Sequence, residues 1–365
     1  MDDYDDKHNR VRKTGFAIED IPIPNPGPRH ISAWEHSLAK MMNGGERQMH
    51  GLTGRSLIYF TSIFVSLGVF LFGYDQGVMS GIITGPYFKS YFNNPTPAET
   101  GVMVSILEIG AFVSSLVVGR LGDIIGRRRT ILYGSIVFVI GGLLQTVANG
   151  MPVMLFGRLI AGVGVGLLST VVPIYQSEIS PAHNRGKASY ILCCFLQRQT
   201  LTFPSLHGKY ICSCALGGEA HRLFSIEFSG NIFGYMTSVW VDYGCSFIES
   251  DYAWRTPLAL QCVMGALLAL GSLIIVESPR WLLDNDHDEE GIVVIANLYG
   301  AGDVHNAQAR DEFRDIKMNV LIHRQEGDRS YAEMFRRYKA RVFIAMSAQA
   351  FAQLNGINGT YSVCM

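Results

Sequence analysis

Apolar residues gather in six windows of the chain, and polar segments separate these windows. The windows cover residues 56–79, 99–119, 130–149, 152–175, 224–244 and 257–276. Together they hold only six Asp, Glu, Lys or Arg residues, although the whole chain has 31 acidic and 30 basic ones. Each window is about 20 residues long, which is enough for a helix to cross a hydrocarbon core of about 30 Å. The pattern predicts an all-α polytopic membrane protein.

The polar segments divide the chain into further parts. Residues 1–55 include a proline-rich stretch and predict a largely disordered N-terminal tail. The windows of residues 56–276 predict a six-helix transmembrane bundle. Residues 277–340 are polar, with apolar positions at helical spacing, and predict a linker of short amphipathic helices. Residues 341–365 predict the beginning of a seventh span that stops within the membrane.

The length limits the number of spans. The segments 1–55, 176–223 and 277–340 are too polar to cross a membrane. The residues that remain suffice for seven helices of about 20 residues, but not for twelve. If the architecture has twelve spans, we therefore expect this chain to be incomplete.

Charge composition supports the membrane class and predicts an orientation. Charged residues make up 17% of the chain, against about 25% in soluble domains. Of the 30 Lys and Arg residues, 26 lie in the tail, in residues 120–129 and 176–223 and in the linker, while residues 80–98 and 245–256 hold one each. Because cytosolic connections carry the excess of basic residues, we expect the N-terminus and the linker to be cytosolic.

Three ionisable residues lie within the windows and away from their ends. Asp75 and Arg158 lie at similar depth near the same membrane face, so an ion pair would lower the cost of burying both. Protonation of Asp75 would release Arg158, as a proton-coupled carrier requires, although a static structural pair remains the alternative. Glu108 lies near the middle of its window and must face a polar cavity or a partner.

Uncharged amides in or near the spans are candidates for contact with a sugar or polyol. Amide groups hydrogen-bond hydroxyl groups, but they also hydrogen-bond across packed membrane helices. Together with Glu108, the candidates are Gln145, Asn231, Gln349, Gln353 and Asn358.

Other chemistry finds little support in the sequence. The glycine-rich stretch 162–166 lies inside an apolar helix and indicates close helix packing, not a nucleotide site. No arrangement of nucleophile, base or metal ligands has convincing spacing, so we expect neither an enzyme nor a metal or cofactor site. Nothing in the sequence indicates nucleic acid binding.

Four motifs in chain order resemble the sugar porter family of the major facilitator superfamily. Residues 119–128 (Gly-Arg-Leu-Gly-Asp-Ile-Ile-Gly-Arg-Arg) are similar to the loop signature between helices 2 and 3. Residues 173–186 run from Pro-Ile-Tyr-Gln-Ser-Glu to Arg-Gly and resemble the signature after helix 4. Residues 277–282 (Glu-Ser-Pro-Arg-Trp-Leu) resemble the motif after helix 6, and residues 353–358 (Gln-Leu-Asn-Gly-Ile-Asn) the sugar motif of helix 7. Ile124, Val276 and Ala352 depart from these patterns.

The resemblance implies a fold and a function. The fold is the N-terminal six-helix bundle of the major facilitator superfamily, followed by a cytosolic helical linker and a partial seventh helix. The function is transport of a hexose or polyol across the plasma membrane, by proton symport with alternating access. The implied partners are the sugar, a proton and the lipid bilayer.

The resemblance also implies roles for individual residues. Asp75 would accept the proton, with Arg158 as its partner, and Gln353 and Asn358 would contact the sugar. A cytoplasmic gate of ion pairs would be formed by Arg120, Asp123, Arg127, Arg128, Glu178, Arg185, Glu277 and Arg280.

Two segments depart from the family pattern. Residues 189–222 match no part of it, and we interpret them as a translated intron or another error in the gene model. After Asn358 the family continues, but this chain stops, so we expect the molecule as written to lack the C-terminal bundle and to be inactive. Sequencing of the complementary DNA across both places tests this interpretation.

Two other functions stay open. A transporter-like sugar sensor would bind sugar and signal, and it would need no proton site. A half-size protein that assembles from two copies would take up sugar by itself.

Overall fold

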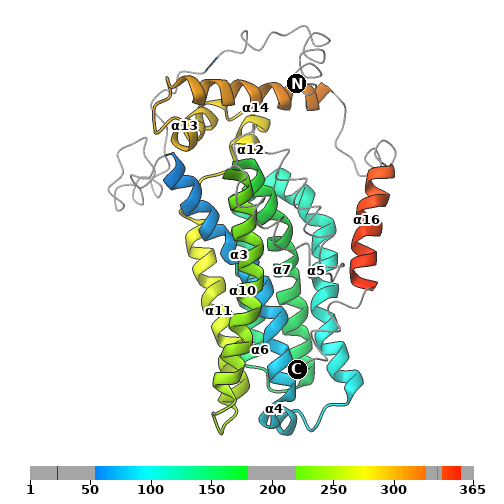
Figure 1. Ribbon diagram of the computed structural model, residues 1–365. Helices are drawn as coiled ribbons and strands as arrows, with labels where there is room; N and C mark the ends of the chain where they lie inside the picture. Colours follow the sequence, from blue (N-terminus) through cyan, green and yellow to red (C-terminus); the bar gives the residue numbers. More distant parts are fainter. Residues whose placement is uncertain (1–22, 24–53, 180–218, 326–334, 336–338, 355–365) are drawn as a thin grey trace, which may run out of the picture. The chain divides into compact units, whose positions relative to one another are not determined.

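The structure is a computed structural model that describes residues 23, 54–179, 219–325, 335 and 339–354. The described residues form α-helices and no β-strand (Figure 1). The chain divides into two compact units. One unit comprises residues 60–276 and 351–365, and the other comprises residues 1–59 and 277–350.

The first unit is a bundle of long helices that correspond to the six apolar windows. The helices are α3 (Arg55–Thr84), α5 (Pro97–Ile125), α6 (Arg127–Thr146), α7 (Met151–Ile179), α10 (Glu219–Cys245) and α11 (Tyr252–Ser272). All but α10 are long and apolar enough to cross a membrane over their described residues. A short helix, α4 (Pro86–Tyr91), lies between α3 and α5. The all-α membrane fold predicted from the sequence is confirmed.

Several helices run past the windows that predicted them. The helices α3, α5 and α7 have 30, 29 and 29 residues, or roughly 45 Å at 1.5 Å per residue. Backbone hydrogen bonding continues into polar residues, so hydropathy alone underestimates helix length. By contrast, α11 ends at Ser272, before the predicted limit of 276, because Leu273 and Ile274 donate backbone hydrogen bonds three residues back, to Leu270 and Gly271.

Local sequence explains where α5 begins and ends. Thr96 and Glu99 form a reciprocal capping box ahead of the helix, and Pro97 occupies its first position. Gly126 is the C-cap residue of α5 and also the N-cap residue of α6. Its φ of 103° is a backbone conformation that glycine adopts at low cost. The turn between the two helices therefore needs only one residue.

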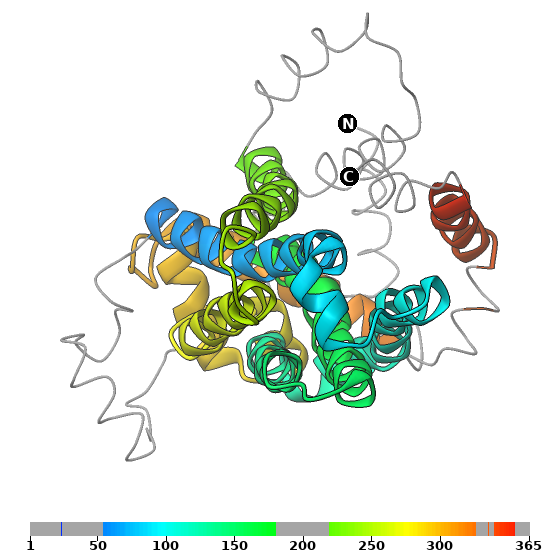
Figure 2. The same cartoon turned by 90° about the horizontal axis from the view of Figure 1, so that it is seen from below.

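Close backbone contacts place α7 between α5 and α6, as the view along the bundle shows (Figure 2). A Cβ atom on Gly162 would lie 2.2 Å from the carbonyl oxygen of Leu107 in α5. A Cβ atom on Gly141 of α6 would lie 2.3 Å from the backbone nitrogen of Ala161. The glycine-rich stretch of α7 thus serves helix packing, as the sequence indicated.

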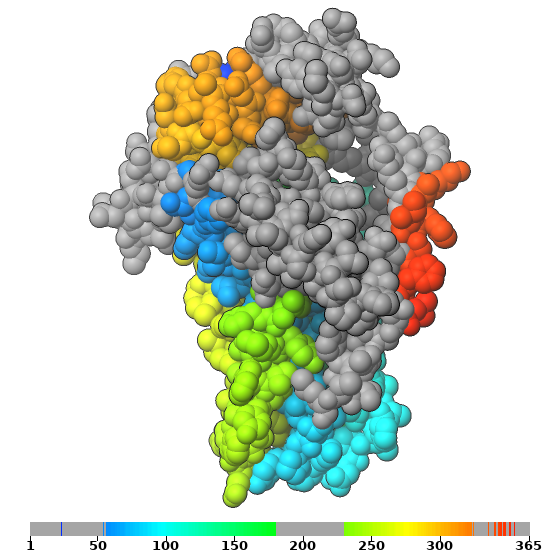
Figure 3. All heavy atoms as spheres, viewed as in Figure 1, coloured from blue at the N-terminus to red at the C-terminus, as the bar shows by residue number. Residues whose placement is uncertain are grey.

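Similar contacts join α3 to α10, whose side chains lie against each other in the space-filling view (Figure 3). A Cβ atom on Gly73 would lie 2.1 Å from the carbonyl oxygen of Asn231, and one on Gly234 would lie 2.2 Å from that of Phe70. Each helix therefore provides a glycine where the other approaches.

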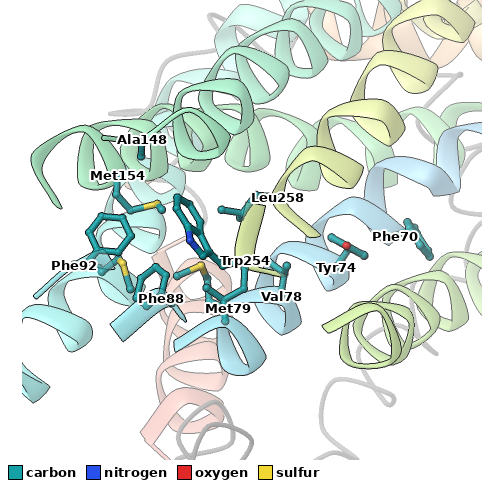
Figure 4. Packing of buried hydrophobic residues seen from close by; sticks show 12 residues of the cluster. Phe70, Tyr74, Val78, Met79, Phe88, Phe92, Ala148, Met154, Trp254 and Leu258 are labelled. Atoms are coloured by element: carbon teal, nitrogen blue, oxygen red, sulfur yellow. The ribbon is translucent and has the colours of Figure 1, made fainter. Parts of the chain in front are cut away.

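An aromatic cluster fills one end of the bundle (Figure 4). Trp254 of α11 packs against Phe88 of α4 and against Phe92, with ring centroids 5.9 and 5.6 Å apart. Tyr74 of α3 donates a hydrogen bond to the carbonyl oxygen of Pro257 over 3.1 Å. Through these contacts α3, α4 and α11 pack against one another, next to the site described below.

The second unit contains the short helices of the linker. These are α12 (Pro279–Asp284), α13 (Asp288–Tyr299) and α14 (Ala307–Gln325), and α16 (Lys339–Leu354) follows them along the chain. The first three pack around a small core that includes Leu283, Ile292 and Phe313. At its surface, Lys317 donates hydrogen bonds to both carboxylate oxygens of Asp288, over 2.7 and 2.9 Å.

Candidate functional site

A buried ion pair joins two helices of the bundle. Asp75 of α3 is 0% exposed and Arg158 of α7 is 1% exposed. The Nη1 atom of Arg158 lies 3.6 Å from the Oδ1 atom of Asp75. The structure thus brings together the two charges that the sequence placed at similar depth. Because both are removed from solvent, each depends on the other for most of its compensation.

The pair has few further hydrogen bonds. Among the described residues, neither carboxylate oxygen of Asp75 has a hydrogen-bond partner, and neither does the Nε atom of Arg158. The Nη1 atom of Arg158 donates a long hydrogen bond, 3.5 Å, to the Oε1 atom of Gln145. A contact of 3.6 Å between the charges is too long for a strong charge-assisted hydrogen bond. The pair is therefore loosely held.

Further ionisable groups lie in the same part of the bundle. Glu108 of α5 is exposed at the bundle surface, and its charge acts on Arg158. The charge of Asp75 interacts electrostatically with the neighbouring Tyr74, and so does the charge of Asp242 on α10. Asp242 packs against Gly81 of α3. The structure therefore adds a third carboxylate to this region.

Gln261 of α11 is a buried polar residue that the sequence pattern does not distinguish. Its side chain is 0% exposed, and both its oxygen and its nitrogen are without a hydrogen-bond partner among the described residues. It faces α6, where a Cβ atom on Gly142 would lie 3.4 Å from its Nε2 atom. No motif contains Gln261, so only its position inside an apolar window could have drawn attention to it.

The amides predicted to contact sugar have different surroundings. Gln145 is 0% exposed, and its Nε2 atom donates to the carbonyl oxygen of Gly157 over 3.4 Å. Both ends of this amide thus contact α7. Asn231 is partly buried, at the contact of α10 with α3. Gln349 and Gln353 belong to α16, but the structure does not describe their side chains. Asn358 lies outside the described residues.

A second charged centre lies about 30 Å along α7, twenty residues after Arg158. Glu178 accepts two hydrogen bonds from Arg127 of α6, over 3.0 and 3.1 Å. Arg127 also donates to the carbonyl oxygen of Gly122 and forms an ion pair of 2.9 Å with Asp123. Three residues of the predicted gate, Asp123, Arg127 and Glu178, therefore form one network.

The remaining predicted gate residues have different surroundings. Arg128 donates hydrogen bonds to the carbonyl oxygens of Ser272 and Leu273, over 3.0 and 2.8 Å. It thereby provides a donor for carbonyl groups at the C-terminal end of α11, which lack partners within the helix. Arg120 is exposed. Glu277 accepts a hydrogen bond from the backbone nitrogen of Ser278, and Arg280 is half-buried in α12. Arg185 lies outside the described residues.

A small cavity lies between α3, α4, α10 and α11, lined in part by Gly81, Phe88, Asp242 and Trp254. Its volume of about 50 Å³ compares with about 300 Å³ or more for a typical ligand pocket. This cavity can hold water, but it cannot hold a hexose.

A protein-family model described as "Sugar (and other) transporter" matches residues 61–196 and 219–362. The unmatched residues between these two ranges fall within the segment 189–222, which the motifs also leave unassigned.

Individual proteins of this kind are similar to the chain. "MFS-type transporter criB" of Aspergillus cristatus is 35% identical over 309 residues, which are 84% of this chain and 58% of the relative. The "High-affinity glucose transporter" of Kluyveromyces lactis is 30% identical over 82% of this chain and 48% of the relative. The chain spans about half the length of these curated relatives.

Solved structures share the fold. XylE of E. coli, described as a proton:xylose symporter and solved with 6-bromo-6-deoxy-D-glucose, superposes with a TM-score of 0.59 at 23% identity. The match covers 75% of this chain and 55% of XylE.

Proposed function

Because the chain belongs to the sugar (and other) transporter family, we propose that it serves proton-coupled transport of a hexose or polyol across a membrane. The buried pair of Asp75 and Arg158 carries this proposal, since ionisable residues inside a membrane bundle are costly and mark ion pathways. The transport of glucose by a relative and of xylose with protons by XylE supports it. The protein is a multi-pass membrane protein, and we assign it no enzymatic activity.

In this proposal Asp75 is the proton acceptor. A proton from water binds a carboxylate oxygen of Asp75 and neutralises it, while Arg158 stays charged. The loss of attraction releases Arg158 from Asp75, and the movement between α3 and α7 that follows couples proton uptake to the change of access. The contact of 3.6 Å supports such a role, because no strong hydrogen bond has to be broken once Asp75 is protonated.

The Arg127 network is the proposed cytoplasmic gate. Its two hydrogen bonds join the adjacent ends of α6 and α7 and would hold the helix ends together in one access state. The excess of Lys and Arg on one side supports a cytosolic position for this network and for the N-terminus. We place the protein in the plasma membrane by analogy with the sugar transporters that it resembles.

Transport in this fold uses two bundles that rock about a site between them. The described bundle supplies the proton site, and the sugar contacts proposed for Gln353 and Asn358 belong to the segment after the linker. A second bundle would have to come from further sequence or from a second copy of the chain. We therefore propose that transport requires a second bundle in addition to the one described here.

A transporter-like sugar sensor is the second candidate function. A sensor would bind sugar without moving it and would not need an ionisable pair in its core. The buried pair of Asp75 and Arg158 favours transport.

Uptake of labelled hexose in a host without sugar carriers tests the proposal. Two proteins are compared: the 365-residue chain, and this chain joined after its linker to the second half of the Kluyveromyces lactis transporter. We expect uptake by the joined protein only, with dependence on a proton gradient and loss in Asp75→Asn. Uptake without a proton gradient would contradict the role of Asp75, and uptake by the chain alone would indicate a self-sufficient assembly.

A further inference from the structure

One nitrogen atom of Arg158 lies between two oxygen acceptors. Its Nη1 atom is 3.6 Å from the Oδ1 atom of Asp75 and 3.5 Å from the Oε1 atom of Gln145. Hydrogen bonds from a guanidinium group to a carboxylate are usually about 2.7–2.9 Å long. The nitrogen is therefore shared between a group that can take up a proton and one that cannot, and it is tightly bound to neither.

The surroundings of Gln145 hold its side chain in this place. The amide is fully buried, and its nitrogen donates to the carbonyl oxygen of Gly157, one residue before Arg158. A Cβ atom on Gly157 would lie 3.0 Å from the Cγ atom of Gln145, so the glycine allows this close approach of α6 and α7. With its nitrogen bound to α7, the amide directs its oxygen at Arg158.

We propose that Gln145 is a positioning residue that accepts the hydrogen bond of Arg158 whenever Asp75 carries a proton. With Asp75 ionised, Nη1 closes on the carboxylate. With Asp75 protonated, Nη1 closes on the oxygen of Gln145, and the buried guanidinium keeps an acceptor. The proposal rests on the proton-coupled function, and it assigns Gln145 a role in this exchange in place of contact with sugar.

The role of Gln145 follows from the cost of a buried charge. A buried guanidinium without an acceptor is costly, so loss of Asp75 as a partner is tolerated only where another oxygen is near. Gln145 stabilises the protonated state of the site and thereby raises the affinity of Asp75 for its proton. Removing the amide should make Asp75 release its proton at lower pH.

Other titratable and polar groups near the pair come from several helices. Tyr74 lies on α3 beside Asp75, Glu108 of α5 acts on Arg158, and Asp242 and Cys245 of α10 act on Tyr74. On α11, the thiol of Cys262 and the amide of Gln261 face α6 near Gly142. Gln145 of α6 differs from these groups in its described contacts, because it donates to α7 and also accepts from Arg158.

Infrared difference spectroscopy of the purified 365-residue chain in lipid nanodiscs provides the test. The carbonyl stretch of a protonated carboxylic acid is followed against pH, and the part that Asp75→Asn abolishes is assigned to Asp75. In Gln145→Leu, which keeps the size of the side chain, we expect the midpoint to move toward acid by about one pH unit, a tenfold loss of proton affinity.

Gln145→Glu provides a second variant with the opposite sign. The introduced carboxylate keeps the acceptor and competes with Asp75 for Arg158, so Asp75 should hold its proton to higher pH than in the parent chain. A role in packing alone does not predict opposite shifts from two substitutions of similar size. The second variant also keeps the proposal testable where Gln145→Leu does not fold.

Gln176→Leu is the matched control. Gln176 is also a buried amide of the bundle, 2% exposed, and donates to the carbonyl oxygen of Ser62. It lies about 27 Å from Arg158 along α7, so the midpoint of Asp75 should not move. A shift of the same size in the control would overturn the proposal, because it would show a general packing effect.

The outcomes separate this inference from the proposed function. If an Asp75 band titrates and its midpoint is unchanged in both Gln145 variants, the positioning role is wrong and the proton site stands. If no band depends on Asp75, the proposed proton coupling itself fails.

Discussion

The two charged centres of the bundle both use α7 but differ in geometry. The pair of Asp75 and Arg158 is fully buried, 3.6 Å long and almost without further hydrogen bonds. The pair of Arg127 and Glu178 lies near the helix ends and has two hydrogen bonds of 3.0 and 3.1 Å, with a third from Arg127 to a backbone carbonyl. The Arg127 network is held by several hydrogen bonds, whereas the buried pair has no strong hydrogen bond between its two charges. The difference agrees with our proposal that the first centre exchanges a proton and the second is a gate.

The largest expected effect comes from breaking the buried pair on one side only. Asp75→Asn leaves Arg158 buried without a counter-charge and should lower the free energy of unfolding by about 3–5 kcal/mol. Titration of the purified protein with a denaturing detergent, followed by circular dichroism, measures the loss.

The control for this prediction removes both charges. Asp75→Asn combined with Arg158→Gln should recover much of the stability, because no uncompensated charge remains. Equal losses in the single and double variants would show that the charges do not depend on each other.

The packing that positions the first centre can be weakened without changing a charge. Gly162→Ala places a Cβ atom against the backbone of α5 and should cost about 1–3 kcal/mol of unfolding free energy. Gly101→Ala is the matched control on α5, because nothing lies within 4 Å of its Cβ position. We expect this control to be neutral or stabilising, since alanine favours helix. If both variants behave alike under the same detergent titration, the close approach is not important for stability.

The second centre should tolerate substitution better than the first. Glu178→Gln removes the charge that Arg127 binds but leaves polar groups that can still accept, so we expect a loss of about 1–2 kcal/mol. The exposed carboxylate of Glu249 provides a comparison through Glu249→Gln, which should change stability by less than about 0.5 kcal/mol. A loss from Glu178→Gln as large as that from Asp75→Asn would remove the distinction between the two centres.

The smallest effect is expected in the linker unit, where ion pairs are exposed. The hydrogen bond from Arg324, with the nearby charge of Lys317, holds the pKa of Asp286 below its usual range. A lowered pKa means that the ionised form stabilises the fold, fully above the usual range and progressively less as the pH falls through it.

Asp286→Asn should therefore cost at most about 0.5 kcal/mol near neutral pH and nothing in strong acid, since the carboxylate is 66% exposed and screened by solvent. Thermal unfolding of the protein at several pH values, with and without added salt, measures this difference. A constant difference across the acid range would show that the charge of Asp286 does not contribute.

The sequence predicted much of the fold because the membrane restricts the possible structures. Six apolar windows correspond to α3, α5, α6, α7, α10 and α11, since backbone groups in lipid must be hydrogen-bonded within each helix. Helix ends were less predictable: α3 and α7 continue into polar residues, and α11 stops before its window does. Hydrogen bonding and turns decide those ends, and hydropathy does not measure them.

The candidate site was predictable in its charges but not in its partners. Asp75 and Arg158 stand out because charges are rare in apolar windows, and their depth predicted that they would meet. Gln145 could equally have faced a cavity, a lipid or another helix. Gln261 and Asp242 could be noticed as polar residues in apolar windows, but their surroundings could not be predicted, because a linear pattern does not show which helix lies opposite.

The sequence by itself therefore determined the class of protein, the approximate spans, the family motifs and the charges buried in the core. Each of these depends on the cost of placing a residue in lipid or on a local motif, and both can be read along the chain. Only the tertiary structure decided that Nη1 of Arg158 lies between Asp75 and Gln145 and that Arg127 binds Glu178. Those contacts join residues of three helices, and they depend on where glycines allow the helices to approach.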